Sequence, residues 1–279
     1  MRLSHNMFSE GIYKNYKKAL VDNSKAMNNL GSGKKINCSK DNPNKMAQSV
    51  NLKISLLCRD AANKNIQDTN SMIQTFDGGL QEINNNLSRL KDLTVKSGSG
   101  ANSPEDEQII QKEIAKIKED INYLADSTSF NDIKLSDSSV TNNAIPNSKE
   151  STIGALPDEK VNIPFFNVST NGLQISGIDV TNTANLGANL KAVDDAIVTV
   201  TSIRSQYGAI QSRLSGTADG MSEMDQSINS SLSNIEDADI AEESLEYSRT
   251  QIKYQAAIAL MAQSNKLPQD ALNILASVR

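Results

Sequence analysis

The sequence predicts a mainly α protein: an elongated antiparallel coiled-coil or helical-bundle rod with a small β-hairpin insert at its far tip. Apolar and small residues recur at steps of three and four through most of the stretch 190–279. This period of about 3.5 residues keeps them on one helical face and is typical of coiled coils. Residues 129–185 lack that rhythm, are rich in Ser, Thr and Asn, and hold three of the six prolines. We therefore expect helical ends and a β-rich middle.

The composition suits narrow seams between helices better than one thick core. Of the 279 residues 38% are hydrophobic and 4% aromatic, and there is no Trp. The 28 Lys and Arg and 33 Asp and Glu leave a net charge of −5 without a basic block, so we expect no nucleic-acid partner. No apolar run approaches the roughly 18 to 20 residues of a membrane span. The N-terminus lacks the features of a signal peptide, so we expect a cytoplasmic chain or one exported without cleavage.

An amphipathic first helix is expected up to Leu30, ending at Gly31-Ser32-Gly33. The next helix begins after Asp41-Asn42-Pro43, because proline is comfortable in a first turn and disfavours helix before it. That helix should run from 46 to about 96, and its clearest seam is Ile73, Phe76, Leu80, Ile83, Leu87, Leu90 and Thr94. Gly78-Gly79 costs roughly 1 kcal/mol per glycine against alanine, which tight packing must offset.

A returning helix is expected from Ser103-Pro104-Glu105-Asp106, which combines a serine N-cap, a first-turn proline and acidic residues near the positive helix end. It should end near Ser127. Its seam is Ile110, Ile114, Ile117, Ile121 and Leu124.

The insert contains an Asn-Gly hairpin signal, in which Thr170-Asn171-Gly172 lies between Phe165–Ser169 and Leu173–Val180. One further strand is expected near 130–135. In the C-terminal pattern, Pro268 should kink the helix or start a short terminal one. We expect three regions: 1–45 with 235–279 as a terminal coiled coil, 46–128 with 186–234 as a helical rod, and 129–185 as a short β-rich insert.

Signals of catalysis are nearly absent. The one histidine, His5, has no nucleophile or metal-ligand pattern around it, and no catalytic or phosphate-binding motif occurs. The acidic residues around Asp237 and Asp239 are interpreted as a polar helix surface rather than a cation site, because calcium loops need turn glycines and converging ligands. Cys38 and Cys58 are interpreted as reduced thiols in preference to a disulfide. We expect no enzyme activity, cofactor or metal.

Several short sequence motifs carry information beyond the helical periodicity. They are Leu30-Gly31-Ser32-Gly33-Lys34-Lys35-Ile36-Asn37, Ser39-Lys40-Asp41, Ile83-Asn84-Asn85-Asn86-Leu87-Ser88-Arg89-Leu90-Lys91-Asp92-Leu93, Ser129-Phe130-Asn131, Tyr207-Gly208-Ala209-Ile210-Gln211-Ser212-Arg213-Leu214, Ile235-Glu236-Asp237-Ala238-Asp239 and Met261-Ala262-Gln263-Ser264-Asn265-Lys266-Leu267-Pro268-Gln269. Together and in this order they resemble the conserved stretches of bacterial flagellins, the subunits of the flagellar filament. The stretch Asn42-Pro43-Asn44-Lys45 and the two cysteines depart from that family's usual pattern.

The resemblance implies that the terminal helices pair, line the inner tube of the filament and drive polymerisation. It implies a secreted protein of the extracellular flagellum, exported unfolded and uncleaved by the flagellar type III apparatus. The implied partners are further copies of the chain, an export chaperone, and hook-associated and cap proteins. The expected polymerisation seam comprises Leu3, Met7, Ile12, Tyr16, Leu20, Leu245, Ile252, Ala256, Leu260, Leu267 and Leu275.

Three positions, Arg89, Leu93 and Glu113, match the contact site of flagellins for the host Toll-like receptor that senses them. Glu113 has a simpler interpretation as the partner of a neighbouring Lys or Arg. For function as a whole, the alternative to a filament subunit is a hook–filament junction adaptor of the same architecture. An enzyme built into such a frame is disfavoured, because the short insert has no histidine.

Overall fold

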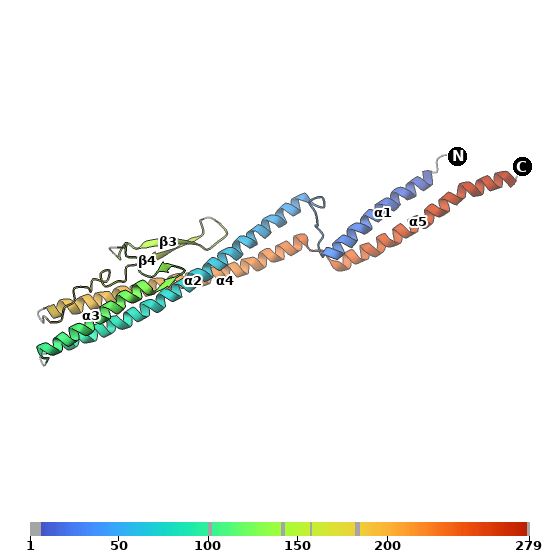
Figure 1. Cartoon of the computed structure of the whole chain (residues 1–279). Coiled ribbons are helices and arrows are strands. Elements are labelled where there is room, and N and C mark those ends of the chain that lie inside the picture. Colours follow the sequence, from blue (N-terminus) through green and yellow to red (C-terminus); the bar gives the residue numbers. More distant parts are fainter. Residues whose placement is uncertain (1–6, 100–101, 141–142, 157, 182–184, 278–279) are drawn as a thin grey trace. The chain divides into compact units, whose positions relative to one another are not determined.

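The computed structural model describes residues 7–99, 102–140, 143–156, 158–181 and 185–277. The elements in chain order are α1 (Met7–Ser32), α2 (Pro43–Ser97), α3 (Pro104–Ser127), β1 (Ser129–Phe130), β2 (Ile133–Lys134), β3 (Asn147–Thr152), β4 (Lys160–Phe165), α4 (Leu186–Glu236) and α5 (Ile240–Ser277) (Figure 1). The predicted mainly α fold with a small β insert is confirmed. None of the helices within the described ranges is long and apolar enough to cross a bilayer.

The chain forms two compact units. The terminal unit comprises Met1–Ile54 and Gln226–Arg279, and the central unit comprises Ser55–Asp225. Helices α2 and α4 contribute to both, while α1 and α5 belong wholly to the terminal unit.

The helix ends follow their local sequence. Gly33 has φ 70° after α1, a conformation that glycine adopts without steric cost. At the start of α2 the Asn42 side chain accepts a hydrogen bond of 3.1 Å from the Lys45 N–H. At the start of α3 Ser103 and Asp106 form a reciprocal capping box, followed by Pro104. These three boundaries were predicted from the sequence.

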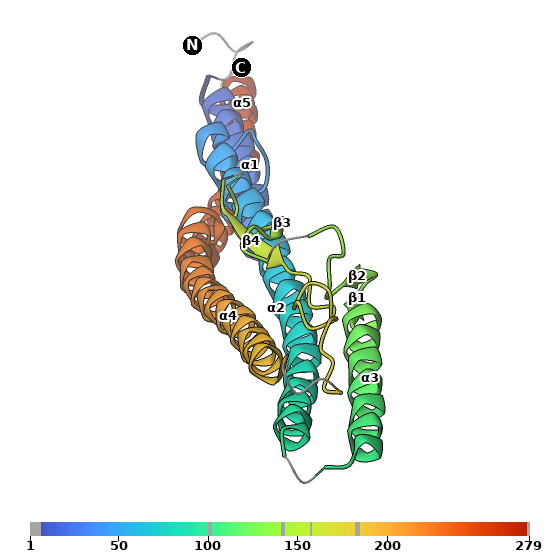
Figure 2. The same cartoon turned by 90° about the vertical axis from the view of Figure 1, so that its left-hand side faces the viewer.

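Three helices pack together in the central unit, as Figure 2 shows for α2, α3 and α4. The predicted seam of α2 is buried, and so is that of α3 except for Leu124, which is partly buried against the same core. Helix α4 adds Val193, Ala196, Val200, Ile203, Tyr207 and Leu214. The expected tight packing at the glycine pair is found at Gly79, where an added Cβ would lie 2.8 Å from the Thr128 side chain. A Cβ added at the neighbouring Gly78 would meet no atom within 4 Å.

The β insert packs along the side of these helices, so the expectation that it lies at their far tip is wrong. Phe165 of β4 meets Phe76 of α2 edge-on at 5.8 Å, and the Tyr207 hydroxyl of α4 donates to the Pro164 carbonyl at 2.9 Å. Burial raises the pKa of Tyr207. The insert carries large apolar side chains that water cannot accommodate, and the helix flank supplies the surface that covers them.

The predicted hairpin around Asn171-Gly172 is also wrong. The pair that forms is β3 with β4, antiparallel, with Asn147 opposite Phe165 and Thr152 opposite Lys160. The expected single strand near 130–135 is a tight hairpin of β1 and β2, whose turn residues Asn131 and Asp132 have φ 48° and 63°.

The segment 170–180 is held by side chains of α3 in place of a partner strand. Asn122 accepts from the Thr170 N–H at 2.9 Å, and Lys118 donates to the Ile178 carbonyl at 2.7 Å. Gln111 accepts from the Val180 N–H at 3.0 Å. Strand alternation would leave half of the segment's apolar residues facing water, whereas Leu173, Ile175, Ile178 and Val180 are all buried here.

Helix α5 continues through Pro268 as one element. The expectation that Pro268 starts a separate terminal helix is therefore not met.

Candidate functional site

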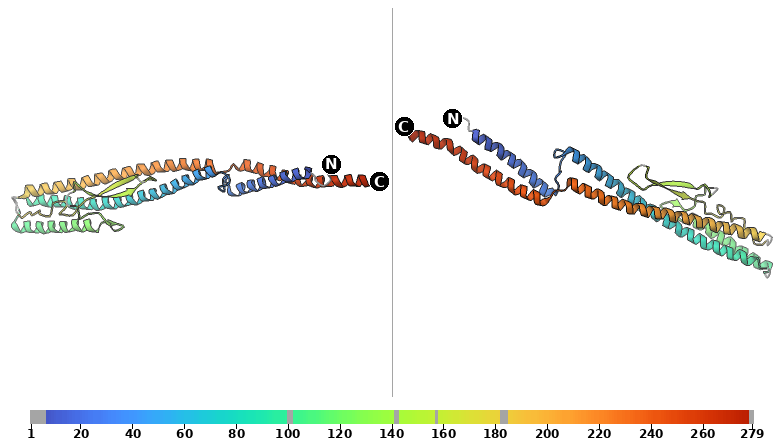
Figure 3. Two further views of the ribbon diagram at one scale, coloured as in Figure 1. Left: turned by 90° about the horizontal axis from the view of Figure 1, so that it is seen from above. Right: turned by 180° about the vertical axis from the view of Figure 1, so that it is seen from behind.

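The terminal helices α1 and α5 form an antiparallel pair, and they lie side by side in both views of Figure 3. Ser9 donates to Asn265 at 3.4 Å, Asn23 donates to the Tyr247 carbonyl at 3.2 Å, and Asn29 donates to Glu243 at 2.9 Å. The rings of Tyr16 and Tyr254 lie 6.4 Å apart. Residues later in α1 contact residues earlier in α5, so the two helices run in opposite directions.

The interface of this pair is made mainly by small and polar residues. On α1 the buried positions are Ala19, Ala26 and Asn29, and on α5 they are Thr250, Ala257 and Ser264. On each helix these positions are three or seven residues apart, so they form one face. Small side chains allow the helix axes to approach closely. The polar ones hydrogen-bond across the gap, since Asn23 also donates to the Thr250 hydroxyl at 3.1 Å.

The structure divides the expected polymerisation seam. Ile12 and Tyr16 are partly covered within the pair. Six larger residues are exposed on the outside: Met7, Leu20, Leu245, Ile252, Leu260 and Leu267, with exposed fractions from 45% to 81%. Ala256 is also exposed. Leu3 lies outside the described residues, as does His5, and the side chain of Leu275 is not among those described.

The face of α5 that contacts α1 therefore differs from the apolar stripe that the sequence singled out. Periodicity alone finds the stripe with the largest apolar side chains, whereas close antiparallel packing selects the stripe with the smallest. Leu245 and Ile252 remain uncovered in the single chain as a result.

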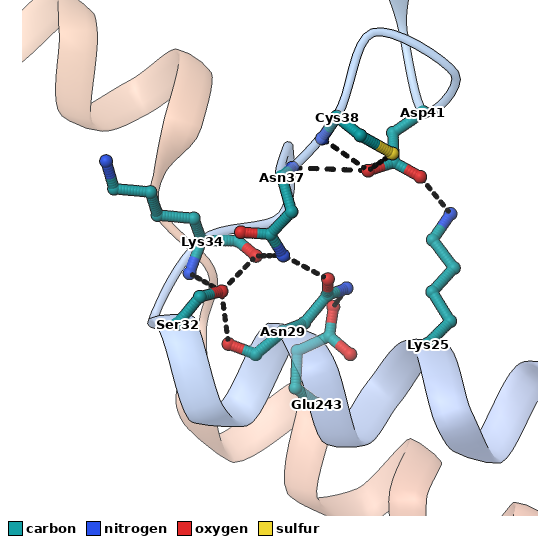
Figure 4. Close-up of polar contacts among 8 residues, drawn as sticks. All are labelled: Lys25, Asn29, Ser32, Lys34, Asn37, Cys38, Asp41 and Glu243. Atoms are coloured by element: carbon teal, nitrogen blue, oxygen red, sulfur yellow. Dashed lines mark hydrogen bonds and ion pairs between the residues drawn. The ribbon is translucent and has the colours of Figure 1, made fainter.

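The turn from α1 to α2 is organised by Asp41 (Figure 4). One carboxylate oxygen accepts from the Cys38 thiol at 3.3 Å and from the N–H groups of Asn37 and Cys38 at 3.2 Å each. These bonds, the thiol's first among them, lower the pKa of Asp41. Cys38 and Cys58 are both exposed free thiols, as expected. The Asn37 side chain donates to Asn29, which in turn donates to Glu243 of α5 (Figure 4).

The turn is also tied to the connection between α4 and α5. The Lys35 N–H donates to the Glu236 carbonyl at 2.7 Å, and the Ala238 N–H donates to the Gly33 carbonyl at 2.9 Å. The Lys35 ammonium donates to the Asn234 carbonyl at 2.7 Å, which places a positive charge at the negative end of α4.

Glu236 is the centre of a buried charge cluster that the sequence did not predict. It is only 4% exposed and accepts from Ser49 at 2.5 Å, pairs with Lys34 at 3.0 Å, and pairs with Lys53. The Lys53 contact, followed by those of Ser49 and Lys34, lowers the pKa of Glu236 to about 2. Interpreting all the acidic residues near 237 as polar surface was therefore wrong for Glu236. Its partners lie far away in the sequence, so no local signal could have indicated them.

In the central unit Arg89 and Glu113 form an exposed ion pair between α2 and α3, with Arg89 Nη2 2.6 Å from Glu113 Oε1. Leu93 does not join them on the surface. It is 3% exposed and belongs to the helical core. The simpler interpretation of Glu113, as the partner of a neighbouring arginine, describes the contact that forms.

In the described ranges, no group of three or more His, Cys, Asp or Glu side chains lies close enough together to hold a metal ion. In the terminal unit, large apolar side chains are exposed on the flanks of the α1–α5 pair, and Glu236 forms a buried charge cluster with Lys34 and Lys53.

Comparison with known proteins covers nearly the whole chain. Residues 3–141 match the family model described as the bacterial flagellin N-terminal helical region, and residues 190–275 match the bacterial flagellin C-terminal helical region. A flagellin of Halalkalibacterium halodurans is 30% identical over 277 residues, covering 99% of this chain and 100% of the relative. A flagellar filament core protein of Brachyspira hyodysenteriae is 31% identical over 287 residues, with the same coverage.

Among solved structures, a putative flagellar hook-associated protein from Vibrio parahaemolyticus has a TM-score of 0.55 at 12% identity, covering 71% of this chain and 100% of that one. That similarity concerns the fold alone. The crystal structure of Bacillus cereus flagellin has a TM-score of 0.49 at 24% identity, covering 57% of this chain and 88% of that chain.

Proposed function

The chain belongs to the bacterial flagellin family, and we propose that it polymerises through the exposed apolar flanks of its α1–α5 pair. It is a structural subunit of the flagellar filament rather than an enzyme, since both flagellin regions match and relatives with that role align along its full length. As a filament component it is part of an extracellular structure. The comparisons give no support to the alternative of a hook–filament junction adaptor.

One observation carries the proposal for the polymerising surface. The α1–α5 interface buries small residues such as Ala26 and Thr250, while Leu20, Ile252 and Leu267 remain 45%, 67% and 64% exposed. A stripe of large apolar residues with helical spacing is unfavourable in water and requires cover from other helices. In a homopolymer, neighbouring copies supply that cover.

Elongation of filament fragments by purified monomer tests this proposal. We expect Ile252→Ser to slow elongation about tenfold, because burial of an isoleucine contributes about 1.5 to 3 kcal/mol and each 1.4 kcal/mol is a factor of ten. Val198→Ser is the matched control, since Val198 is equally exposed at 66% but lies on α4 in the central unit. Equal elongation by both variants, measured as filament length in electron micrographs, would refute the assembly role of α5.

The remaining partners follow from the family as proposals. We propose export of the unfolded, uncleaved chain by the flagellar type III apparatus, and contacts with hook-associated and cap proteins at the filament ends. Before export a chaperone would cover α5, whose exposed Leu245, Ile252 and Leu260 support such a role. A pull-down of this chain with and without residues 240–279 tests the chaperone contact, and equal recovery would exclude α5 as its site.

A host Toll-like receptor for flagellin remains a proposed partner of the free monomer. The supporting feature is the exposed Arg89–Glu113 pair, with side chains 58% and 44% exposed. Buried Leu93 would contribute by supporting α2 beneath that pair. We expect the Arg89→Ala, Glu113→Ala double variant to bind the receptor at least tenfold more weakly, and unchanged affinity would remove this surface from consideration.

A further inference from the structure

We propose that Met224 is a site of reversible oxidation whose sulfoxide is held by Arg59, so that oxidation strengthens the contact between α4 and α2. Met224 lies on α4 and Arg59 on α2, and both belong to the central unit. The oxidant that this site takes is a hydroperoxide. The site lies outside the terminal helices, so its chemistry is independent of the proposed polymerisation.

The sulfur of Met224 already contacts the guanidinium of Arg59. Arg59 Nη2 donates to Met224 Sδ at 3.1 Å, although a thioether sulfur is only a weak acceptor. Met224 is 53% exposed, so dissolved oxidants reach this side chain. Met221, one turn earlier on α4, is 6% exposed and belongs to the core. The two methionines of α4 therefore differ in access to solvent.

Arg59 has a further donor that this contact leaves unused. Its Nε atom is buried and donates to no acceptor among the described residues. Oδ1 of Asp225 lies 3.9 Å from that Nε atom, which is beyond hydrogen-bond distance. A buried guanidinium N–H without an acceptor costs free energy. Arg59 therefore gains from an additional oxygen acceptor beside Met224.

Oxidation of Met224 supplies such an acceptor. A hydroperoxide transfers its outer oxygen to a lone pair of the sulfur, so that an S–O bond forms and the O–O bond breaks. The remaining oxygen takes up the proton of the transferred oxygen and leaves as water or an alcohol. The sulfur loses two electrons, which reduce the peroxide. The new oxygen is one bond from the sulfur that Arg59 contacts, and the guanidinium fork offers it charged N–H donors.

The surroundings of Met224 reverse the usual consequence of methionine oxidation. A sulfoxide is polar and disrupts packing in an apolar core, which is the expected result at the buried Met72 and Met221. Met27 is 61% exposed and makes no hydrogen bond within the described residues, so its oxidation should change stability little. At Met224 the added oxygen meets a cation, and we expect stabilisation.

Substitutions test the acceptor without any oxidant. Met224→Gln places a carbonyl oxygen near the position of the sulfoxide oxygen, whereas Met224→Leu places no acceptor there. We expect Met224→Gln to have a thermal unfolding midpoint about 2 to 4 °C above that of Met224→Leu, the shift that one hydrogen bond to a charged group gives in a unit of this size. The difference should vanish when both variants also carry Arg59→Leu, which removes the donors and cancels the difference in helix propensity.

Peroxide treatment of the full chain tests the oxidation itself. Met7→Leu and Met27→Leu first remove two other exposed methionines. Peptide mass spectrometry measures the oxidised fraction of Met224, and thermal unfolding measures stability. The midpoint should rise by about 2 to 4 °C with Arg59 and not with Arg59→Leu. Met224→Leu, treated in the same way, reports the effect of oxidation elsewhere in the chain. Methionine sulfoxide reductases should return the midpoint to that of the untreated chain.

Three results would overturn the proposal. The first is an unchanged or lower midpoint after oxidation of Met224 with Arg59 in place, once the change in Met224→Leu is subtracted. The second is an equal rise in the Arg59→Leu chain, because Arg59 would then not hold the sulfoxide. The third is a native chain in which Met224 stays unoxidised while Met27 is oxidised. None of these results affects elongation of filament fragments, which tests the proposed polymerisation separately.

Discussion

At the scale of single residues, the chemistry of the terminal unit depends most on Glu236. Its carboxylate is almost fully buried and is held ionised by Lys53, Ser49 and Lys34, with a pKa lowered to about 2. The folded chain therefore binds fewer protons at this site than the unfolded chain when the pH is between about 4.5 and 2. The resulting stabilisation, on the order of 3 kcal/mol at most, is present above pH 4.5 and is lost as the pH falls towards 2.

Glu236→Gln should lower the free energy of unfolding by about 2 kcal/mol at pH 7, since the two lysines lose their anionic partner. The difference from the native chain should shrink as the pH falls through 4 and disappear near 2. Urea denaturation of the monomer at a series of pH values measures both effects. Glu242→Gln, at an exposed position near the cluster, should change neither, and a pH-independent loss in Glu236→Gln would contradict the charge explanation.

A second residue with a clear expectation is Asp132 in the turn between β1 and β2. Its φ of 63° and the φ of 48° at Asn131 place both residues in the left-handed region, where glycine is favoured at the second position. Asp132→Gly should raise the free energy of unfolding by about 0.5 to 1 kcal/mol. Ser138→Gly, also exposed but without a positive φ, should not be stabilising, and equal stabilisation by both would argue against the turn as the cause.

The residue-scale predictions succeeded where the determinants are local in sequence. The capping box of Ser103 and Asp106, the glycine after α1 and the proline at the start of α2 were all anticipated, because each depends on a few neighbouring residues. The burial of Glu236 depends on residues more than 180 positions away, and the burial of Leu93 depends on tertiary packing.

At the scale of elements, the adjacent glycines of α2 offer a paired test of packing. Gly78→Ala should raise the free energy of unfolding by about 0.5 to 1 kcal/mol, because alanine favours helix and the added Cβ meets open space. Gly79→Ala should lower it by about 1 kcal/mol, because its Cβ would lie 2.8 Å from Thr128 and 3.2 Å from Leu135. Thermal unfolding of the two variants in parallel measures the sign. Stabilisation by both variants would contradict this expectation, because it would mean that Thr128 and Leu135 beside the β1–β2 hairpin shift to accommodate the added Cβ at little cost in free energy.

Helices were the elements that sequence patterns predicted well, since long periodic seams such as that of α2 leave little ambiguity. The insert was predicted poorly because its local and tertiary preferences differ. Asn171-Gly172 is a good hairpin signal, yet Asn122 and Lys118 of α3 bind the backbone around it and hold the segment as a series of turns. The face of α5 was missed for a related reason, because the interface with α1 uses small residues that apolar periodicity gives little weight.

At the scale of the whole molecule, the two units differ in how completely each covers its own apolar side chains. The central unit has its own core, built from α2, α3, α4 and the insert around Phe76 and Tyr207. The interface of the terminal pair is made mainly by small and polar residues, and many of the large apolar side chains of the pair are exposed. Such a pair gains little stability alone, since isolated helices in water depend on packing of their apolar faces. Assembly should therefore order α1 and α5, whereas the central unit and the contacts of Glu236 with Ser49 and Lys53 between α4 and α2 are ordered beforehand.

Amide hydrogen exchange on monomer and filament is the most direct test of this central claim. In the monomer we predict weak protection of α1 and α5 and strong protection of the core segments of α2 and α4. In the filament, protection of α1 and α5 should rise by orders of magnitude, while that of the central core should change little. Strong protection of residues 7–30 already in the monomer would contradict the claim, because the terminal pair would then be complete without its neighbours.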